Sequence, residues 1–402
     1  MIKFYDEIEN AKKILYDNST SGLSATNVQS AIDVLKSLLD SLSALDIAYD
    51  NTSSGLTATN VQDAIDELAS SGGGGTAESI SYDNSKTILK ATNVKDAIDE
   101  ICSYIVLIPP PAGDGGVFGG GKDCHGTRFS VMEYIQISQI GYSRIFGDLY
   151  VARDKLAGVD NGTNNRGVFG GGERGYTVAT MDYINVVMLG NASYFGVLTV
   201  VRSYLAGVNN GTNDRGVFGG GWDNNVMDYI TISTPSNASD FGDLTVARNE
   251  LAGVSNGENN RGVFGGGKDN NYNKLNIMDY ISINSPGNAS DFGDLTVARS
   301  CLAGVSNGTK NRGVFGGGYY IYDVMDYISI NSPGNASDFG DLTVKKYDLA
   351  GVSNGINNRG LFGGSGKLLK DIDYIKINCN TNARSFGELV VGRSCLAGVD
   401  NS

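Results

Sequence analysis

One short segment occurs six times between residues 116 and 366, and each copy ends in a run of glycines. Its clearest copy is Arg261–Gly267, which reads Arg-Gly-Val-Phe-Gly-Gly-Gly. The period lies between 46 and 51 residues, as the phenylalanines in register show: Phe118, Phe169, Phe218, Phe264, Phe315 and Phe362. Such a period indicates stacked supersecondary units, because one unit of this size cannot bury its apolar face alone.

Each unit has the pattern of four short strands. In the best-preserved unit these are Leu251–Val254, Arg261–Phe264, Met278–Ile283 and Phe292–Arg299, separated by turn-forming residues. No stretch within a unit is long or periodic enough to predict a helix. Four short strands joined by turns are typical of a propeller blade.

These units resemble kelch repeats, and the resemblance covers residues 115–402. A kelch unit has a hydrophobic pair before two glycines, then a tyrosine, a tryptophan and an arginine, and Val263–Gly266, Tyr280, Phe292 and Arg299 occupy these places in order. The departure is phenylalanine for tryptophan in all six units: Phe146, Phe195, Phe241, Phe292, Phe339 and Phe386. The resemblance implies a kelch-like β-propeller with one blade per unit.

The two ends of the repeat region complement each other. The first unit begins at Asp114–Val117 and lacks the Leu-Ala-Gly strand that opens every other unit, whereas Cys395–Asp400 supplies such a strand after the last unit. Pairing the two would complete the first blade and remove the open edges of the ring. The sequence therefore predicts a mainly β fold, a six-bladed propeller closed by its C-terminal strand.

A different repeat, with a period of 33 residues, precedes the propeller, and its copies begin at Tyr16, Tyr49 and Tyr82. Thr59 and Gln62 match a capping box at the start of a short helix. In the first copy, an apolar stripe follows coiled-coil spacing: Val28, Ile32, Leu35, Leu39 and Leu42. Because helices this short are marginal alone in water, we expect them to pack against other copies of the chain as an oligomeric stalk. The alternative is that they fold back on the propeller.

The sequence of this repeat, Tyr-Asp-Asn followed by Ala-Thr-Asn-Val and Ala-Ile-Asp, resembles a module of bacteriophage tail-fibre and related tail proteins over residues 14–101. The resemblance implies a virion tail appendage, often a homotrimer, assembled in the host cytoplasm. We expect a stalk over residues 1–106 with a glycine-rich joint at 70–75, a proline-rich linker over 107–114, and the propeller over 115–402.

Composition limits the possible partners. The formal net charge of −13 argues against nucleic acid or an anionic membrane surface, because phosphate binding requires clusters of Lys and Arg. No basic-then-apolar segment follows Met1, and no apolar run approaches the length needed to span a membrane. We therefore expect this chain to carry neither a secretion signal nor an anchor.

Few residues suggest catalysis or metal binding. The single histidine, His125, adjoins Cys124 without further ligands at metal-site spacing, and the five cysteines show no pairing pattern. Asp182 and Arg153 have counterparts in nearly every unit, which favours structural ion pairs over a single catalytic site. We expect free thiols, no metal, no cofactor and no enzymatic activity.

The units differ most between the glycine run and the tyrosine strand. These segments hold the aromatic residues that we predict to bind a receptor: Trp222, Tyr176, Tyr272, Tyr319, Tyr320 and Tyr322. In a four-stranded blade the loops between the second and third strands all emerge at one end of the propeller. Aromatic side chains there would suit stacking on sugars or contact with a protein epitope. Alternatively, the loops vary because nothing constrains them.

The leading functional prediction is a tail-fibre protein whose propeller recognises a bacterial surface receptor, glycan or protein, and whose N-terminal part contacts other tail or baseplate proteins. Two alternatives remain open at this stage. One is a purely structural tail component without receptor contact. The other is a tail-spike enzyme that degrades a glycan, which would need an asymmetric pair of catalytic groups on one face or in the channel.

Overall fold

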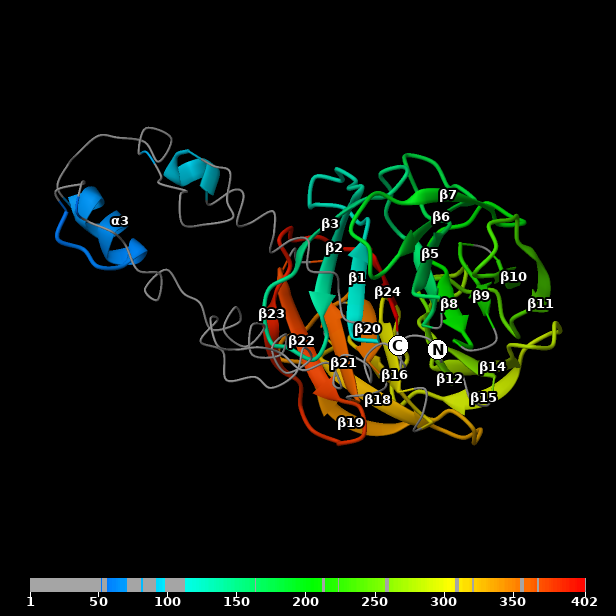
Figure 1. Ribbon diagram of the computed structural model, residues 1–402. Helices are drawn as coiled ribbons and strands as arrows, with labels where there is room; N and C mark the ends of the chain where they lie inside the picture. The colour runs from blue at the N-terminus through cyan, green and yellow to red at the C-terminus, as the bar shows by residue number, and fades with distance from the viewer. Residues whose placement is uncertain are drawn as a thin grey trace, which may run out of the picture. The chain divides into compact units, whose positions relative to one another are not determined.

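A computed structural model describes residues 52, 56–70, 81, 92–97, 113–162, 164–211, 214–222, 224–256, 260–307, 311–319, 322–354, 358–366 and 369–401. The chain divides into two compact units, Met1–Ile105 and Val106–Ser402 (Figure 1). The predicted seam residues lie outside the described residues: Val28, Ile32, Leu35, Leu39 and Leu42.

In the first unit, the described elements are the helix α3 (Val61–Ser70) and a helical turn over residues 94–97. The cap of α3 lies one residue later than predicted, because it is Asn60 and Asp63 that form it. Asn60 Oδ1 accepts a hydrogen bond from the backbone N–H of Asp63 at 2.8 Å, and Asn60 Nδ2 donates to the Asp63 carboxylate at 2.7 Å. Asn93 and Asp96 repeat both bonds in the next copy. Asparagine is at least as good as threonine at this position.

The second unit is a ring of six antiparallel sheets with four strands each. From the axis outward, blades 1 to 3 contain β24 (Ala397–Asp400), β1 (Gly115–Gly119), β2 (Val131–Gln136), β3 (Arg144–Asp148); β4 (Ala157–Asn161), β5 (Arg166–Gly170), β6 (Thr180–Asn185), β7 (Ser193–Val197); and β8 (Ala206–Asn209), β9 (Arg215–Gly219), β10 (Val226–Thr231), β11 (Ser239–Asp243). Blades 4 to 6 contain β12 (Ala252–Asn256), β13 (Arg261–Gly265), β14 (Ile277–Ser282), β15 (Ser290–Asp294); β16 (Ala303–Asn307), β17 (Arg312–Gly316), β18 (Val324–Ser329), β19 (Ser337–Asp341); and β20 (Ala350–Asn354), β21 (Arg359–Gly363), β22 (Asp371–Lys376), β23 (Arg384–Glu388).

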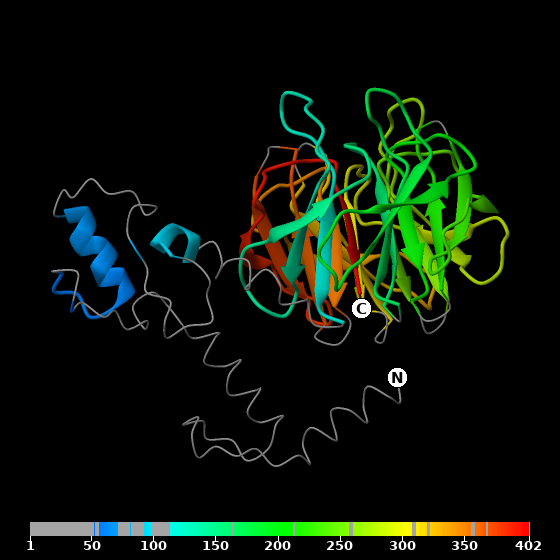
Figure 2. The ribbon, with the colours of Figure 1, turned by 45° about the horizontal axis from the view of Figure 1, so that its top comes forward.

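The predicted closure by the C-terminal strand is confirmed. β24 pairs with β1 antiparallel, with Val399 opposite Val117, and so forms the inner strand of blade 1. The inner strands contact one another around the whole ring, and β24 lies between β20 and β4 (Figures 1 and 2). The six-bladed propeller therefore has no open blade.

The glycine runs serve two purposes. A Cβ on Gly265 would lie 2.9 Å from the ring of Phe315 in the next blade, so the first glycine permits close contact between blades. Gly266 and Gly267 have φ of 66° and 105°, a conformation that other residues rarely adopt. Between each two blades lies an apolar cluster such as the one around Val263, Met278 and Phe315.

The recurrent aspartates and arginines form buried ion pairs between adjacent blades, as predicted. Arg153 Nη1 lies 2.6 Å from Asp182 Oδ2, and neither side chain is exposed. The same arrangement recurs in Arg202–Asp228, Arg248–Asp279 and Arg299–Asp326. Two pairs depart from the pattern, since Asp373 pairs with Lys346 and Arg393 pairs with Glu133. These pairs are part of the framework of the ring.

Candidate functional site

One end of the propeller carries the loops between the second and third strands together with the connections from one blade to the next. We call this end the loop face. In each blade the residue three positions after the first glycine of the run donates its backbone N–H to the connection from the preceding blade, as Trp222 does to the Ser203 carbonyl at 3.0 Å. This recurrent bond places corresponding residues of all blades at corresponding positions around the axis.

The innermost positions of the loop face form a ring held together by the backbone. Its members have φ between 55° and 61°, and each N–H donates to the carbonyl of the preceding member over 2.8–3.0 Å: Lys155, Tyr204, Glu250, Cys301, Asp348 and Cys395. Burial, reinforced by the charge of Asp348, raises the pKa of the Cys301 and Cys395 thiols. The described cysteines are all free: Cys124, Cys301, Cys379 and Cys395.

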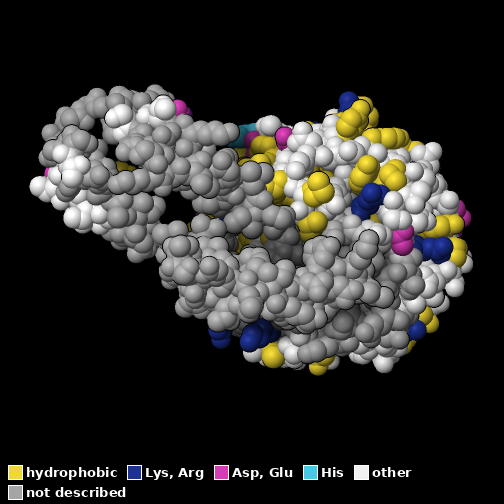
Figure 3. Space-filling view, viewed as in Figure 1, with side chains coloured by type: hydrophobic (Ala, Val, Ile, Leu, Met, Phe, Trp, Pro, Cys, Tyr) yellow, Lys and Arg dark blue, Asp and Glu magenta, His cyan; other side chains and the backbone are white. Residues whose placement is uncertain are grey.

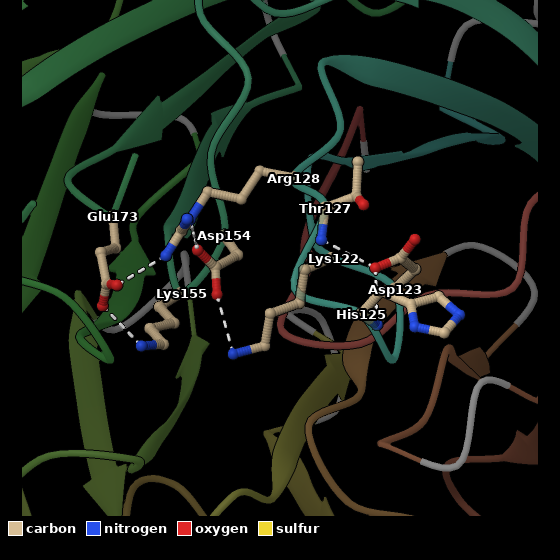
Figure 4. A network of polar contacts seen from close by, with 8 residues as sticks. All are labelled: Lys122, Asp123, His125, Thr127, Arg128, Asp154, Lys155 and Glu173. Carbon is tan, nitrogen blue, oxygen red and sulfur yellow. Dashed lines mark hydrogen bonds and ion pairs between the residues drawn. The ribbon is translucent and has the colours of Figure 1, made fainter. Parts of the chain in front are cut away.

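An ion-pair network links blades 1 and 2 on the loop face (Figure 4). Arg128 lies 2.6 Å from both Asp154 and Glu173, Lys122 lies 3.2 Å from Asp154, and Lys155 lies 2.5 Å from Glu173. Burial opposes ionisation of Glu173, but the hydrogen bond and charge of Lys155 hold its pKa below the ordinary value. Both carboxylates are thus bound by two cations.

A pocket of about 140 Å³ opens between the loops of blades 3 and 4. Its lining combines two exposed aromatic side chains with polar ones: Trp222, Asn249, Lys268, Asp269, Asn270 and Tyr272. Trp222 is 41 % exposed and Tyr272 is 68 % exposed. We call this site the aromatic pocket.

The aromatic rings of the pocket form a chain that leads toward the axis. The centroids of Trp222 and Tyr272 lie 6.3 Å apart with an interplanar angle of 73°, and the ring of Tyr204, a member of the inner ring of the loop face, lies 6.5 Å from that of Trp222. Lys268 Nζ lies 5.5 Å from the Trp222 ring and 5.3 Å from the Tyr272 ring. Its charge is matched by Glu250, 2.6 Å away.

The blade 4 loop is built on a short aspartate-capped turn. Asp269 Oδ1 accepts hydrogen bonds from the backbone N–H groups of Asn271 at 2.9 Å and Asn273 at 2.8 Å. Asp123 holds the blade 1 loop through the same two kinds of bond, with His125 at its tip turned away from the ion pairs (Figure 4). The two loops therefore share one scaffold.

Tyr272 stands at a position of this scaffold that favours glycine. Its φ is 63°, whereas the blade 1 loop has Gly126 at the same place with a φ of 82°. A bulky side chain with positive φ is strained, and such strain is concentrated at functional sites. At this position the Tyr272 ring lies beside Trp222.

A buried acceptor completes the pocket. Asn249 is 3 % exposed, yet its Oδ1 has no hydrogen-bond partner in the described part of the protein. An unsatisfied buried polar atom costs about 1–3 kcal/mol. Asn249 lines the pocket, but this oxygen itself is not exposed, so a bound ligand would reach it only after the side chain turns toward the pocket.

A second aromatic cluster joins the loops of blades 4 and 5 to the connection from blade 5 to blade 6. Tyr319 and Tyr347 meet edge to face at 5.1 Å, and Lys274 Nζ lies 5.7 Å from Tyr319 and 5.5 Å from Tyr322. Tyr176 lies apart from both clusters on blade 2, with Arg174 over its ring at 5.1 Å. Tyr320 is outside the described residues.

The structure thus brings the predicted residues Trp222 and Tyr272 into one pocket, and Tyr319 and Tyr322 into another cluster. Sequence reasoning missed four contributors, all of which begin a loop or belong to a connection between blades: Tyr204, Asn249, Lys268 and Tyr347. The two positions after each framework arginine or lysine differ between most units, and that variation could have identified the connections.

The outer rim of blades 1 and 2 is another surface that sequence reasoning missed. Ile145 and Tyr194 are 48 % and 51 % exposed on outer strands, where blades 3 to 5 place aspartate. Tyr150 lies 6.2 Å from Tyr194. Figure 3 shows hydrophobic side chains over the upper part of the propeller, where Figure 1 places β3, β6 and β7.

Comparisons with known proteins add little to this description. No protein-family model matches the chain, and no curated protein matches it. Among solved structures it is similar to one described as "Structure of YjhT", with 12 % identity and a TM-score of 0.49 over 62 % of this chain and 88 % of that chain. The propeller is established by its own strand pairing. In the described residues, no helix has the length and hydrophobicity to span a membrane.

Proposed function

We propose that this protein is a host-recognition component of a bacteriophage or phage-like tail fibre, and that the aromatic pocket binds a receptor on the bacterial surface. One observation carries the proposal. On the end of the ring where the blades differ, the exposed rings of Trp222 and Tyr272 line one pocket with Asn249, a buried residue whose side-chain oxygen has no partner in the described part of the chain.

The chemistry of the pocket supports binding. Trp and Tyr supply large rigid contact areas at a low cost in side-chain entropy, and both are enriched at recognition surfaces. In the structure the Tyr272 ring already lies beside Trp222, with the ring centroids 6.3 Å apart. A preformed site of this kind reduces the ordering cost of association.

The same residues favour binding over catalysis. Hydrolysis of a glycosidic bond usually uses two carboxyl groups on either side of the bond. Among the described residues, Asp269 is the one carboxylate that lines the pocket, and it holds its own loop through hydrogen bonds to Asn271 and Asn273. We therefore propose recognition without turnover.

The viral context and the trimer are supported by the N-terminal repeat, whose wording resembles a tail-fibre module over residues 14–101. In this proposal, the N-terminal part joins three chains and docks on other tail or baseplate proteins. Three propellers on one stalk would convert weak single-site binding into firm attachment through effective concentration.

The test is adsorption of the purified full chain to a panel of bacterial cells. We expect Trp222→Ala to reduce adsorption at least tenfold on any strain that binds, while the melting temperature stays within about 2 °C. Tyr142→Ala is the matched control, because Tyr142 is 74 % exposed in the loop between β2 and β3, at the opposite end of the propeller. Normal adsorption of folded Trp222→Ala, or adsorption to no strain, would contradict the proposal.

A further inference from the structure

We infer that the aromatic pocket is selective for an uncharged, hydroxyl-bearing sugar ring. This inference rests on the proposed receptor-binding function and adds the chemical class of the ligand. It follows from three properties of the pocket, namely its aromatic surface, its balance of charge and its unsatisfied acceptor.

The aromatic surface suits a ligand with an apolar face. Trp222 is part-exposed at the wall of the pocket, and Tyr272 meets it nearly edge to face, so that the two rings form a corner. A pyranose presents axial C–H groups on one face and hydroxyl groups around its rim. That face can pack on an indole while the rim reaches polar groups at the side.

The charges in the pocket disfavour ionic ligands of either sign. Lys268 already places its ammonium over both rings, so an incoming cation would meet like charge where a cation–π contact should form. Glu250 neutralises that lysine at 2.6 Å, which leaves no free positive charge for an anion. The Asp269 carboxylate, which also lines the pocket, repels an anion further.

The polar groups indicate what the ligand must offer. Asn249 Oδ1 is buried and has no partner among the described residues, and a turn of this side chain toward the pocket would let it accept a hydrogen bond from a donor such as a hydroxyl group. Asn270 lines the opening and can donate or accept. A site with a buried unpaired acceptor rejects ligands that cannot satisfy it.

The size of the pocket distinguishes a sugar from a protein epitope. A cavity of about 140 Å³ accepts one ring-sized group. Specific contact between two proteins usually buries about 800 Å² on each partner. The pocket is therefore built to hold a single saccharide unit, with further units of a chain lying along the loop face.

The chain contains a single tryptophan, so its intrinsic fluorescence reports directly on this site. The experiment titrates the full chain with glucose, galactose, mannose and N-acetylglucosamine, with oligosaccharides of each, and with matched glucuronic acid, galacturonic acid and glucosamine. We expect a saturable change in Trp222 emission with at least one neutral series, and binding at least tenfold weaker for its charged counterpart. Calorimetry on Asn249→Ala should show at least tenfold weaker binding to the same sugar, and Tyr142→Ala should bind it normally.

Tighter binding of a charged counterpart, or no response to any neutral sugar, would overturn the inference. Loss of affinity in Tyr142→Ala, or full affinity in folded Asn249→Ala, would also contradict it. The outcome is separable from that of the adsorption test. If Trp222→Ala abolishes adsorption but no neutral sugar binds, the receptor-binding function stands and the ligand class is wrong. If a neutral sugar binds but adsorption does not depend on Trp222, the ligand class stands and the proposed function fails.

Discussion

The two ends of the propeller close the same ring by different means. At the end opposite the loop face, each inner strand leads into an asparagine whose side chain donates to an Asn or Asp of a neighbouring blade: Asn161 to Asp214, Asn210 to Asn260, Asn256 to Asn311, Asn307 to Asn358, Asn354 to Asp114 and Asn401 to Asn165. We call this set the asparagine belt. At the loop face, backbone N–H and carbonyl groups close the inner ring instead.

This difference explains where the blades can vary. In the asparagine belt the side chain is itself the bond between blades, so the same residue type recurs at all six positions. In the ring of the loop face the backbone makes the bond, and the side chains are as different as Lys155, Glu250 and Cys301. A uniform framework at one end therefore leaves the other end free to carry a specific site.

The largest expected effect on stability comes from a deletion that disrupts both ends of the propeller at once. Deleting Cys395–Ser402 removes the inner strand of blade 1, one member of the loop-face ring and Asn401 of the asparagine belt. The open ring exposes unpaired strand edges and apolar surface. We expect a melting temperature at least 10 °C lower by calorimetry, or failure to fold. An unchanged transition would contradict the closure.

The next effect concerns the framework that both ends share. Replacing Arg299 by Met leaves the buried Asp326 carboxylate without its partner at 3.1 Å, which should lower the free energy of unfolding by about 3–5 kcal/mol in denaturant titration. Arg299→Lys is the matched control, because Lys346 pairs with Asp373 in this position between blades 5 and 6. A loss in Arg299→Lys as large as that in Arg299→Met would mean that the pair is not the source of the stability.

A direct test of the comparison substitutes one residue at each end of blade 5. Asn307→Ala removes the donor to Asn358 and the acceptor of the Arg312 backbone N–H, and should cost about 1–3 kcal/mol, because two half-buried polar groups lose their partner. Cys301→Ala keeps the backbone bond from its N–H to the Glu250 carbonyl, and should cost less. Equal costs in denaturant titration would mean that the two ends do not differ in the way described.

The sequence was sufficient to predict the structural features that repeat from blade to blade. Six copies of the glycine run and the misplaced strand Cys395–Asp400 predicted the blades and their closure, and both are confirmed. The recurrence of Asp182 and Arg153 likewise predicted a structural pair, and it is one. Repetition reduces the ambiguity in assigning each strand, because the same strand pattern must fit in all six blades.

The sequence could not predict the features that occur in only one blade. The aromatic pocket depends on Asn249 of a connection between blades, whose orphaned oxygen no pattern reveals. It depends also on the ion pair between Lys268 and Glu250, which comes from contact between a loop and the axial ring. Only part of the second aromatic cluster was predicted, because Tyr347 also lies in a connection between blades. Such contacts are set by how neighbouring blades meet.

The smallest effect on stability, and the sharpest separation of the two ends, is expected at Tyr272. Tyr272→Gly relieves the strain at a φ of 63° but adds flexibility to the unfolded chain, so the free energy of unfolding should change by less than about 1 kcal/mol. Tyr272→Asn is a second variant, since asparagine tolerates this conformation. Both should weaken sugar binding at least fivefold, because the ring that forms the corner with Trp222 is lost. Several kcal/mol of destabilisation in both variants would instead make Tyr272 part of the framework, and the loop face would then be as constrained as the asparagine belt.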